Sequence, residues 1–164
     1  MSLGIIPAYT IPNGNLVPCD VNQAKVLKVL GNCILINYQN EHLYVQGIYS
    51  QELGLNILGP EQDDCITCED QVIDRIKKYV YDPEISVNLY DLGLIYEIKL
   101  LPNILQVQMT LTSPACGMGQ LMVDALVNAV SCTKNRSINV DIVFSPRWTM
   151  DRMSLEAKLK LGLM

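Results

Sequence analysis

The sequence predicts an α+β protein in which a small antiparallel β unit precedes a two-layer α-β-β-α-β domain. The first part of the chain contains short β-branched and aromatic runs separated by turn residues, which is typical of antiparallel strands. The remainder alternates between helical and strand periodicity. With 164 residues, 49% of them hydrophobic and 18% charged, the chain is long and apolar enough to bury a core without disulfides.

The small β unit is expected to cover residues 1–59. The turn-forming pairs Gly31-Asn32 and Gln39-Asn40 separate its strand candidates, which lie at 26–30, 34–38 and 43–48. Because such a unit has a thin core, we expect it to pack on the second unit or on a partner. The break at Leu58-Gly59-Pro60 marks the expected boundary.

The second unit is expected to cover residues 60–164 and to begin with an amphipathic helix over about 62–80. Apolar positions recur there at helical spacing, and Asp63 or Asp64 can cap the start. The pair Asp82-Pro83 ends the helix, because proline disfavours helical geometry at the residue before it.

Two strands follow at 95–100 and 104–111, and Pro102-Asn103 between them predicts a hairpin. The second strand alternates apolar and polar residues, which predicts one buried face and one face in water. A helix from Ser113-Pro114 to about Ser131 and a strand at 138–144 complete the core order. Thr149 or Ser154 can cap the final helical turns, which end at Leu161-Gly162.

The charge balance excludes several classes of partner. The formal net charge is −5, from 12 Lys and Arg against 17 Asp and Glu, without any basic cluster, so we expect no nucleic-acid partner. No apolar stretch is long enough to span a membrane. The segment Met1–Pro7 lacks the basic start of a signal peptide, so we expect a cytoplasmic protein without a membrane partner.

Cys116 is the strongest candidate for chemistry, because it lies where a predicted strand meets a predicted helix. A thiol in the first helical turn faces unpaired N–H groups and the positive end of the helix dipole. Both favour the thiolate, the form that binds soft metals and reacts. In the alternative interpretation, Cys116 is a small apolar residue that fills a tight turn between Ala115 and Gly117.

The other cysteines give weaker signals. Cys65 and Cys68 form a C-x-x-C pair that fits a redox dithiol or half a metal site, although helical spacing favours two core-facing thiols. Three more are expected to be structural: Cys19, Cys33 and Cys132. The chain has a single histidine, His42, which leaves no expected Cys/His catalytic pair and no Cys₂His₂ zinc site.

Two further segments carry polar side chains of interest. Asp82, Glu84 and Asp91 could form an acid/base pair, but aspartates in these positions more often cap turns. Trp148 is the only tryptophan and lies near Arg147 and Arg152, which fits a partner-facing loop or a lid over the thiol. A packed C-terminal tail is an equally good interpretation.

Four segments in order resemble one known family, the iron–sulfur assembly domain shared by SufT-type proteins, PaaD-type proteins and eukaryotic cytosolic targeting factors. They are Asp82–Asn88, Asp91–Tyr96, Met109–Cys116 and Trp148–Ser154. The N-terminal unit is also similar to that of SufT-type proteins, on three segments: Ile11–Gly14, Leu30–Asn32 and Leu53-Gly54.

The resemblance implies an auxiliary role in maturing iron–sulfur proteins rather than an enzymatic one. It implies that Cys116 is the functional cysteine and a shared metal ligand, framed by a set of neighbours: Asp82, Glu84, Thr112, Ser113 and Pro114. The expected partner loop contains Trp148, Asp151 and Arg152. Expected partners are an iron–sulfur assembly scaffold, apo-client proteins or a second copy of the chain.

Three hypotheses remain open from the sequence. In the first, Cys116 handles a transient cluster, with no firmly bound cofactor; because one thiolate leaves a cluster short of ligands, a partner, a second copy or glutathione-like thiols supply the rest. In the second, the chain is a non-metal adaptor whose Trp148 loop docks the assembly machinery. In the third, Cys65 and Cys68 form a thiol oxidoreductase site.

Overall fold

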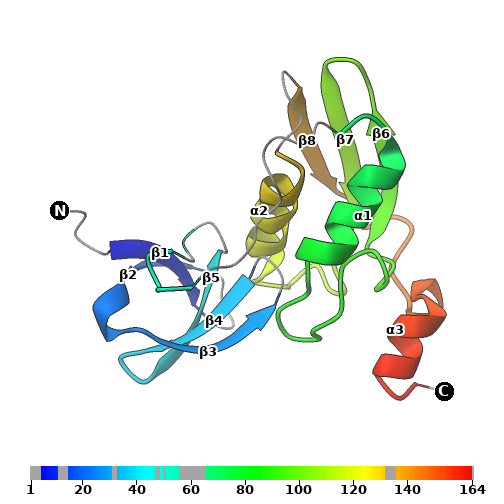
Figure 1. Cartoon of the computed structure of the whole chain (residues 1–164). Coiled ribbons are helices and arrows are strands. Elements are labelled where there is room, and N and C mark those ends of the chain that lie inside the picture. The colour runs from blue at the N-terminus through cyan, green and yellow to red at the C-terminus, as the bar shows by residue number, and fades with distance from the viewer. Residues whose placement is uncertain are drawn as a thin grey trace.

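The computed structural model describes residues 5–10, 15–30, 33–46, 49, 51–55, 66–131 and 136–163. In this part of the chain two separate β-sheets form, and helices α1 and α2 lie against the second sheet (Figure 1). The short helix α3 follows near the C-terminus. The predicted α+β class is confirmed.

The N-terminal sheet has five antiparallel strands in the order β2-β1-β5-β4-β3. Their bounds are β1 Ile5–Thr10, β2 Leu16–Asp20, β3 Lys25–Leu30, β4 Cys33–Tyr38 and β5 Glu41–Gln46. A 3₁₀ turn, η1, spans Val21–Gln23. The predicted hairpin turn is confirmed, since Gln39 and Asn40 take positive φ angles of 51° and 66° between β4 and β5.

Strands β1 and β2 were not expected from the sequence. Pro7 of β1 lies opposite Pro18 of β2, and proline weakens the sequence signal of a strand because it donates no ladder hydrogen bond. Strand β2 is an edge strand, where proline is tolerated. The predicted turns at 11–14 and 31–32 lie outside the described residues.

The second unit has the predicted order α-β-β-α-β followed by a tail. The elements are α1 Glu69–Tyr79, β6 Ile95–Leu100, β7 Ile104–Met109, α2 Gly119–Val130, β8 Ser137–Ile142, η3 Met150–Arg152 and α3 Leu155–Lys160. The sheet order is β6-β7-β8, antiparallel between β6 and β7 and parallel between β7 and β8. The parallel pair requires a crossover, which α2 provides.

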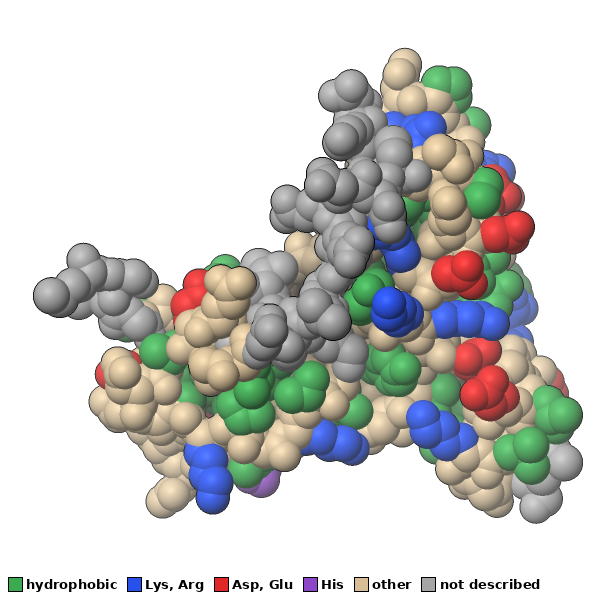
Figure 2. Space-filling model, in the orientation of Figure 1, with side chains coloured by type: hydrophobic (Ala, Val, Ile, Leu, Met, Phe, Trp, Pro, Cys, Tyr) green, Lys and Arg blue, Asp and Glu red, His purple; other side chains and the backbone are tan. Residues whose placement is uncertain are grey.

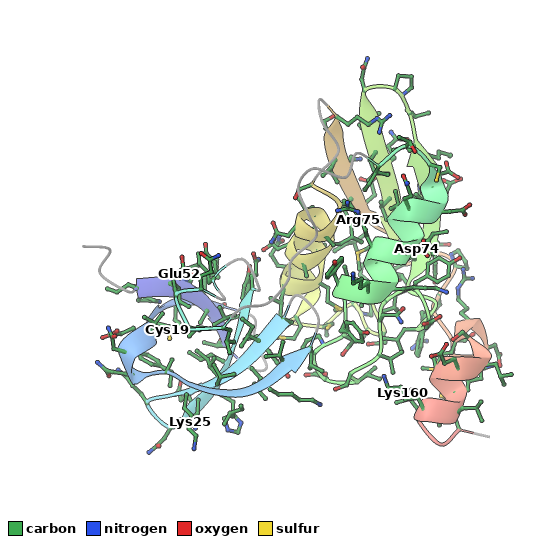
Figure 3. All side chains as sticks on the ribbon, in the orientation of Figure 1. Cys19, Lys25, Glu52, Asp74, Arg75 and Lys160 are labelled. Carbon is green, nitrogen blue, oxygen red and sulfur yellow. The ribbon has the colours of Figure 1, made fainter. Side chains whose placement is uncertain are left out.

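One face of this sheet is buried and the other is more exposed, as the alternation of apolar and polar residues in β7 predicts. Leu105, Val107 and Met109 of β7 are buried on the helix side, whereas Gln108 is exposed. The predicted apolar stripe of α2 is buried: Met118, Leu121, Met122, Ala125, Leu126, Ala129 and Val130. On the neighbouring helix, Arg75 extends toward α2 and donates to the Ala129 carbonyl at 3.3 Å (Figure 3).

The start of α1 corrects a sequence prediction. The helix begins at Glu69, and its N-cap Cys68 is extended without a side-chain capping bond. Gln71 instead reaches back, and its Oε1 accepts from the N–H of Thr67, the residue before the N-cap, at 2.7 Å. Residues 56–65, which include the expected caps and the expected domain boundary, lie outside the described residues.

The N-terminal unit packs on the second unit, as expected from its thin core. Tyr9, Cys33 and Tyr44 belong to the same apolar cluster as the buried faces of α1 and α2. A polar network joins the units as well: the Tyr9 hydroxyl donates to Asp124 of α2, and Gln46 bonds both Tyr9 and Asn128. In the described part of the chain, no helix has the length and apolarity needed to cross a bilayer.

Candidate functional site

The loop between β7 and α2 positions Cys116. The Thr110 N–H donates to the Leu94 carbonyl at 2.8 Å, which ties the end of β7 to the preceding segment. Ser113 then closes a tight turn, because its Oγ accepts from Ala115 N–H and its carbonyl accepts from Cys116 N–H at 3.1 Å. This turn sets the thiol just before the helix.

The helix begins later than predicted, which changes the position of Cys116. Ser113-Pro114 forms a turn rather than a helix start, and α2 begins at Gly119 with Met118 as its N-cap. Cys116 therefore precedes the N-cap by two residues and is not in the first helical turn. The Gly119 N–H donates to the Cys116 carbonyl at 3.3 Å. The backbone amides of Met118 and Gly119 still lie close enough to the sulfur to lower its pKa.

The expectation of a readily ionised thiol is wrong. Cys116 is half-buried and packs against the apolar core. Burial is the largest influence and raises the pKa of the Cys116 thiol, and the nearby Asp82 and Glu84 carboxylates raise it further. The two amides at the sulfur lower the pKa by less, so the thiol stays protonated at neutral pH.

Asp82 and Glu84 lie on the turn that follows α1 and face the thiol. Asp82 is buried, and its Oδ1 accepts from the backbone N–H groups of Glu84 and Ile85 at 2.9 Å each. Burial raises the pKa of Asp82, and these two N–H bonds lower it by less. The turn-capping interpretation of Asp82 is therefore correct, and its charge also reaches Cys116.

The N-terminal unit contributes two residues to this region that the sequence did not indicate. The Tyr44 hydroxyl of β5 donates to the Pro83 carbonyl at 3.0 Å. Cys33 of β4 is 2% exposed, and burial together with Asp82 raises its pKa to about 12. Both residues are far in sequence from the Asp-Pro-Glu turn. Predicting that they lie beside it would have required the pairing register of the strands. The structural interpretation of Cys33 is confirmed.

Trp148 lies on the loop after β8, where two hydrogen bonds hold that loop against the end of the sheet. The indole Nε1 donates to the Leu92 carbonyl and the Tyr96 hydroxyl donates to the Pro146 carbonyl, each at 2.8 Å. The loop encloses a cleft of about 290 Å³ with the Thr-Ser-Pro turn. The cleft is lined by Thr110, Leu111, Thr112, Pro114, Phe144, Arg147 and Trp148.

The predicted site residues therefore fall into two adjoining groups. Cys116 faces Asp82 and Glu84, whereas Thr112 and Pro114 share the cleft with Trp148. Cys116 is not among the residues that line the cleft, so Trp148 is not a lid directly over the thiol.

Asp151 and Arg152 belong to η3 on the far side of the same loop. Both are exposed, and the Arg152 guanidinium stacks over the Tyr96 ring at 4.0 Å. The Arg152 backbone lies tightly against Gly93, where an added Cβ would collide with the Arg152 carbonyl oxygen. Arg152 thus fixes the position of the loop.

The remaining candidates lie away from this region. Cys68 is exposed, which contradicts its expected core-facing position, and Cys65 and Cys132 lie outside the described residues. His42 is exposed on β5 opposite Asn37. Across the described ranges, no three His, Cys, Asp or Glu side chains converge in a metal-binding arrangement.

The comparisons with known proteins agree on one class. The model of the family described as iron-sulfur cluster assembly protein matches residues 69–142, which hold α1 through β8. An Fe-S protein maturation auxiliary factor of Porphyromonas gingivalis is 40% identical over 92 residues, covering 55% of this chain and 88% of the relative. The SufT auxiliary factor of Staphylococcus aureus is 37% identical over 86 residues, covering 51% of this chain and 98% of that protein.

Solved structures show the same fold. A domain of unknown function, DUF59, from Bacillus anthracis is 31% identical with a TM-score of 0.54, over 58% of this chain and 92% of the domain. A conserved hypothetical protein from Thermotoga maritima is 30% identical with a TM-score of 0.51, over 60% of this chain and 96% of its own. This chain belongs to the iron–sulfur cluster assembly protein family and is of the SufT type.

Proposed function

We propose that this chain is an auxiliary factor in the maturation of iron–sulfur proteins and that Cys116 is the thiol with which it handles a cluster or a client. The names of its relatives support the first part. The observation that carries the second part is the position of Cys116 between two amide donors and two carboxylates. The protein performs this role without catalytic turnover of its own.

The surroundings of Cys116 fit a ligand that ionises only when iron arrives. Burial and the carboxylates of Asp82 and Glu84 disfavour the free thiolate, so the resting thiol keeps its proton. An iron cation or cluster displaces that proton on binding, and the carboxylates then attract the cation instead of opposing ionisation. The amides of Met118 and Gly119 stabilise the resulting thiolate.

A single thiol makes the handling a shared event. Iron–sulfur clusters are usually held by four thiolates, and the described residues bring neither a second thiol nor a group of three potential ligands together at Cys116. We therefore propose that the remaining ligands come from an assembly scaffold, an apo-client, a second copy of the chain or glutathione-like thiols. Cluster occupancy is then transient and depends on the partner.

The non-metal adaptor remains a second candidate, and two observations favour it. Cys116 packs against the apolar core, as expected of a structural residue, and the cleft beside Trp148 offers a surface for a partner. Pull-down of assembly proteins with Trp148→Ala and Cys116→Ala variants separates the two functions. Loss of binding with the Trp148 change alone would support the adaptor.

The thiol function is tested by anaerobic reconstitution with iron and sulfide in the presence of a low-molecular-weight thiol. We expect wild type to take up iron and sulfide, and Cys116→Ala to take up much less. The matched control is Cys68→Ala, which removes an exposed thiol far from Asp82 and should behave as wild type. Equal uptake by wild type and Cys116→Ala would contradict the role of this thiol.

A further inference from the structure

The cleft beside Trp148 has no role in the proposed handling of iron by Cys116. It has a volume of about 290 Å³ and opens between the Thr-Ser-Pro turn and the loop after β8. Ligand sites in proteins usually start near this size, which suits one large side chain and its flanking backbone.

The walls of the cleft are mostly apolar. Leu111, Pro114, Phe144 and Trp148 contribute aliphatic and aromatic surface, and Phe144 is 45% exposed. Exposed aromatic side chains around a concavity are typical of protein interaction sites. The Trp148 ring is already oriented by its bond to Leu92, so a ligand would meet a rigid wall.

One polar group in the lining has no partner. Thr110 is 1% exposed, and its Oγ1 makes no hydrogen bond with any described residue. A buried hydroxyl without a partner is unfavourable, and buried hydroxyl groups are generally satisfied. Thr110 lines the cleft, so a ligand whose polar group reaches this hydroxyl would form a hydrogen bond that the described residues do not supply.

The rim of the cleft is positive on a protein that is acidic overall. Arg147 lines the rim, is exposed and forms no ion pair with a described residue. Residues 144–160 carry four basic side chains against two acidic ones, although the whole chain has a net charge of −5. A carboxylate on the ligand would meet complementary charge here.

The C-terminal part of the chain also concentrates exposed apolar side chains. Among the described residues, six of the eleven exposed large hydrophobic side chains lie in 142–163: Ile142, Phe144, Met150, Leu155, Leu159 and Leu163. Hydrophobic side chains are visible on the surface of the C-terminal helix in Figure 2. This distribution favours a protein partner over a small molecule.

We propose that the cleft is a docking site for a segment of a partner protein in which a large apolar side chain lies next to a carboxylate. The apolar side chain enters between Phe144 and Trp148, the carboxylate pairs with Arg147, and a polar group of the segment bonds Thr110. Because Pro114 lines the cleft, docking holds the partner beside the Cys116 loop. Docking does not require Cys116 to bind iron.

Trp148 provides the measurement, because the only tryptophan of the chain lines the cleft. The probe is the blocked peptide acetyl-Ser-Asp-Phe-Asp-Ser-amide, which contains no tryptophan or tyrosine. We expect it to change the Trp148 emission saturably. A probe with Phe replaced by Ala should give no saturable change, and one with both Asp replaced by Asn should bind about two- to five-fold more weakly, as for an exposed ion pair.

Two variants with one matched control locate the contacts. Arg147→Ala should weaken binding of the acidic probe about two- to five-fold and remove the difference between the Asp and Asn probes. Lys160→Ala removes the same charge from α3, where Lys160 is exposed, and should leave binding unchanged (Figure 3). Thr110→Val should weaken binding while the free protein keeps or gains stability, because the lost hydroxyl had no partner.

Several outcomes would overturn the proposal. One is an unchanged Trp148 emission together with no probe-induced amide shifts at Thr110–Ser113 in NMR spectra. A second is equal affinity for the Phe and Ala probes, and a third is equal binding of free phenylalanine amide, which would make the cleft a small-molecule site. Cys116→Ala should bind the probe normally, so loss of iron uptake and loss of docking are separable results.

Discussion

At the residue scale, the environment of Cys116 decides what its sulfur can do. A catalytic or redox cysteine usually has a lowered pKa in an electropositive setting. Cys116 has the opposite setting, because burial and two carboxylates oppose its ionisation. We therefore expect the thiol to resist adventitious oxidation and alkylation, and in the proposed function a bound metal would drive its ionisation.

The raised pKa of Cys116 predicts slow alkylation at neutral pH. Below its pKa the thiol is protonated and unreactive, so the rate of reaction with iodoacetamide should still be rising above the pH at which an ordinary cysteine is fully reactive. Peptide-resolved mass spectrometry across pH 7 to about 10 measures this rate for each cysteine. A Cys116 rate that levels off near neutral pH would show that the pKa of this thiol is not raised.

The buried carboxylate of Asp82 predicts a pH dependence of stability. Because burial raises its pKa, the folded protein holds this proton to higher pH than the unfolded chain does. Asp82 therefore contributes most to the free energy of unfolding below the ordinary aspartate pKa of about 3.9. This contribution is lost as the pH rises through the raised pKa of the folded protein.

Asp82→Asn removes this titration while keeping an oxygen for the Glu84 and Ile85 N–H groups. The free energy of unfolding of the variant relative to wild type should therefore increase between about pH 4 and pH 7 in urea titrations. The same variant should alkylate faster at Cys116, because one of the two carboxylates that raise its pKa is gone. A difference that stays constant with pH would show that Asp82 does not titrate abnormally.

At the element scale, the loop after β8 is fixed by a close backbone approach. Gly93 has a φ of +70°, and a Cβ there would collide with the Arg152 carbonyl oxygen. This contact and the Trp148 and Tyr96 hydrogen bonds hold η3 and the cleft wall against the start of β6. The cleft therefore depends on a residue that lines neither it nor the thiol site.

Gly93→Ala is predicted to lower the free energy of unfolding by more than about 2 kcal/mol, since it combines left-handed backbone strain with a steric clash. Gly162→Ala is the matched control, because Gly162 has a φ of +68° and open space around it. It should cost only the backbone term of about 1–2 kcal/mol. Equal losses in urea unfolding would contradict the importance of the Arg152 contact.

The helices and strands show which sequence signals are reliable. Apolar periodicity located α2 and the alternation of β7 correctly, because those faces are buried against one core. Helix starts were placed too early in both helices. Serine followed by proline usually indicates a helix start, but Ser113 and Pro114 form a turn that precedes α2. The chain needs this turn because it first has to leave the end of β7.

At the scale of the whole molecule, the N-terminal sheet is part of the site rather than an appendage. Tyr44 bonds the turn that carries Asp82, and Tyr9 and Gln46 connect the sheet to α2. Burial is the largest influence that raises the pKa of Tyr9, and its bond to Asp124 raises it further, so the hydroxyl remains a donor.

Tyr9→Phe is predicted to lower the free energy of unfolding by about 1.5–3 kcal/mol, because it removes a hydrogen bond to a charged group at a half-buried interface. Tyr38→Phe is the control on the same sheet, where, within the described part of the chain, the hydroxyl only accepts a hydrogen bond from the exposed Gln39 side chain. It should change stability by less than about 0.5 kcal/mol in urea unfolding. Similar effects of the two changes would mean that the interface bond contributes little.

The sequence predicted the fold class and the residues around Cys116, but not their arrangement. Local patterns placed the Thr-Ser-Pro-Ala-Cys turn between a strand and a helix, and the family resemblance selected Asp82 and Glu84. The contribution of Cys33 and Tyr44 and the separation of Trp148 from the thiol depend on long-range packing. Local periodicity carries no information on such contacts.

The most direct test of the central claim is the alkylation of Cys116 before and after anaerobic loading with iron and sulfide. If Cys116 is the ligand that ionises on metal binding, its labelling at pH 8 to 9 should fall sharply in the loaded protein and return after chelation, while Cys68 labels equally in both forms. If loaded and unloaded protein label Cys116 at the same rate, its sulfur does not hold the cargo.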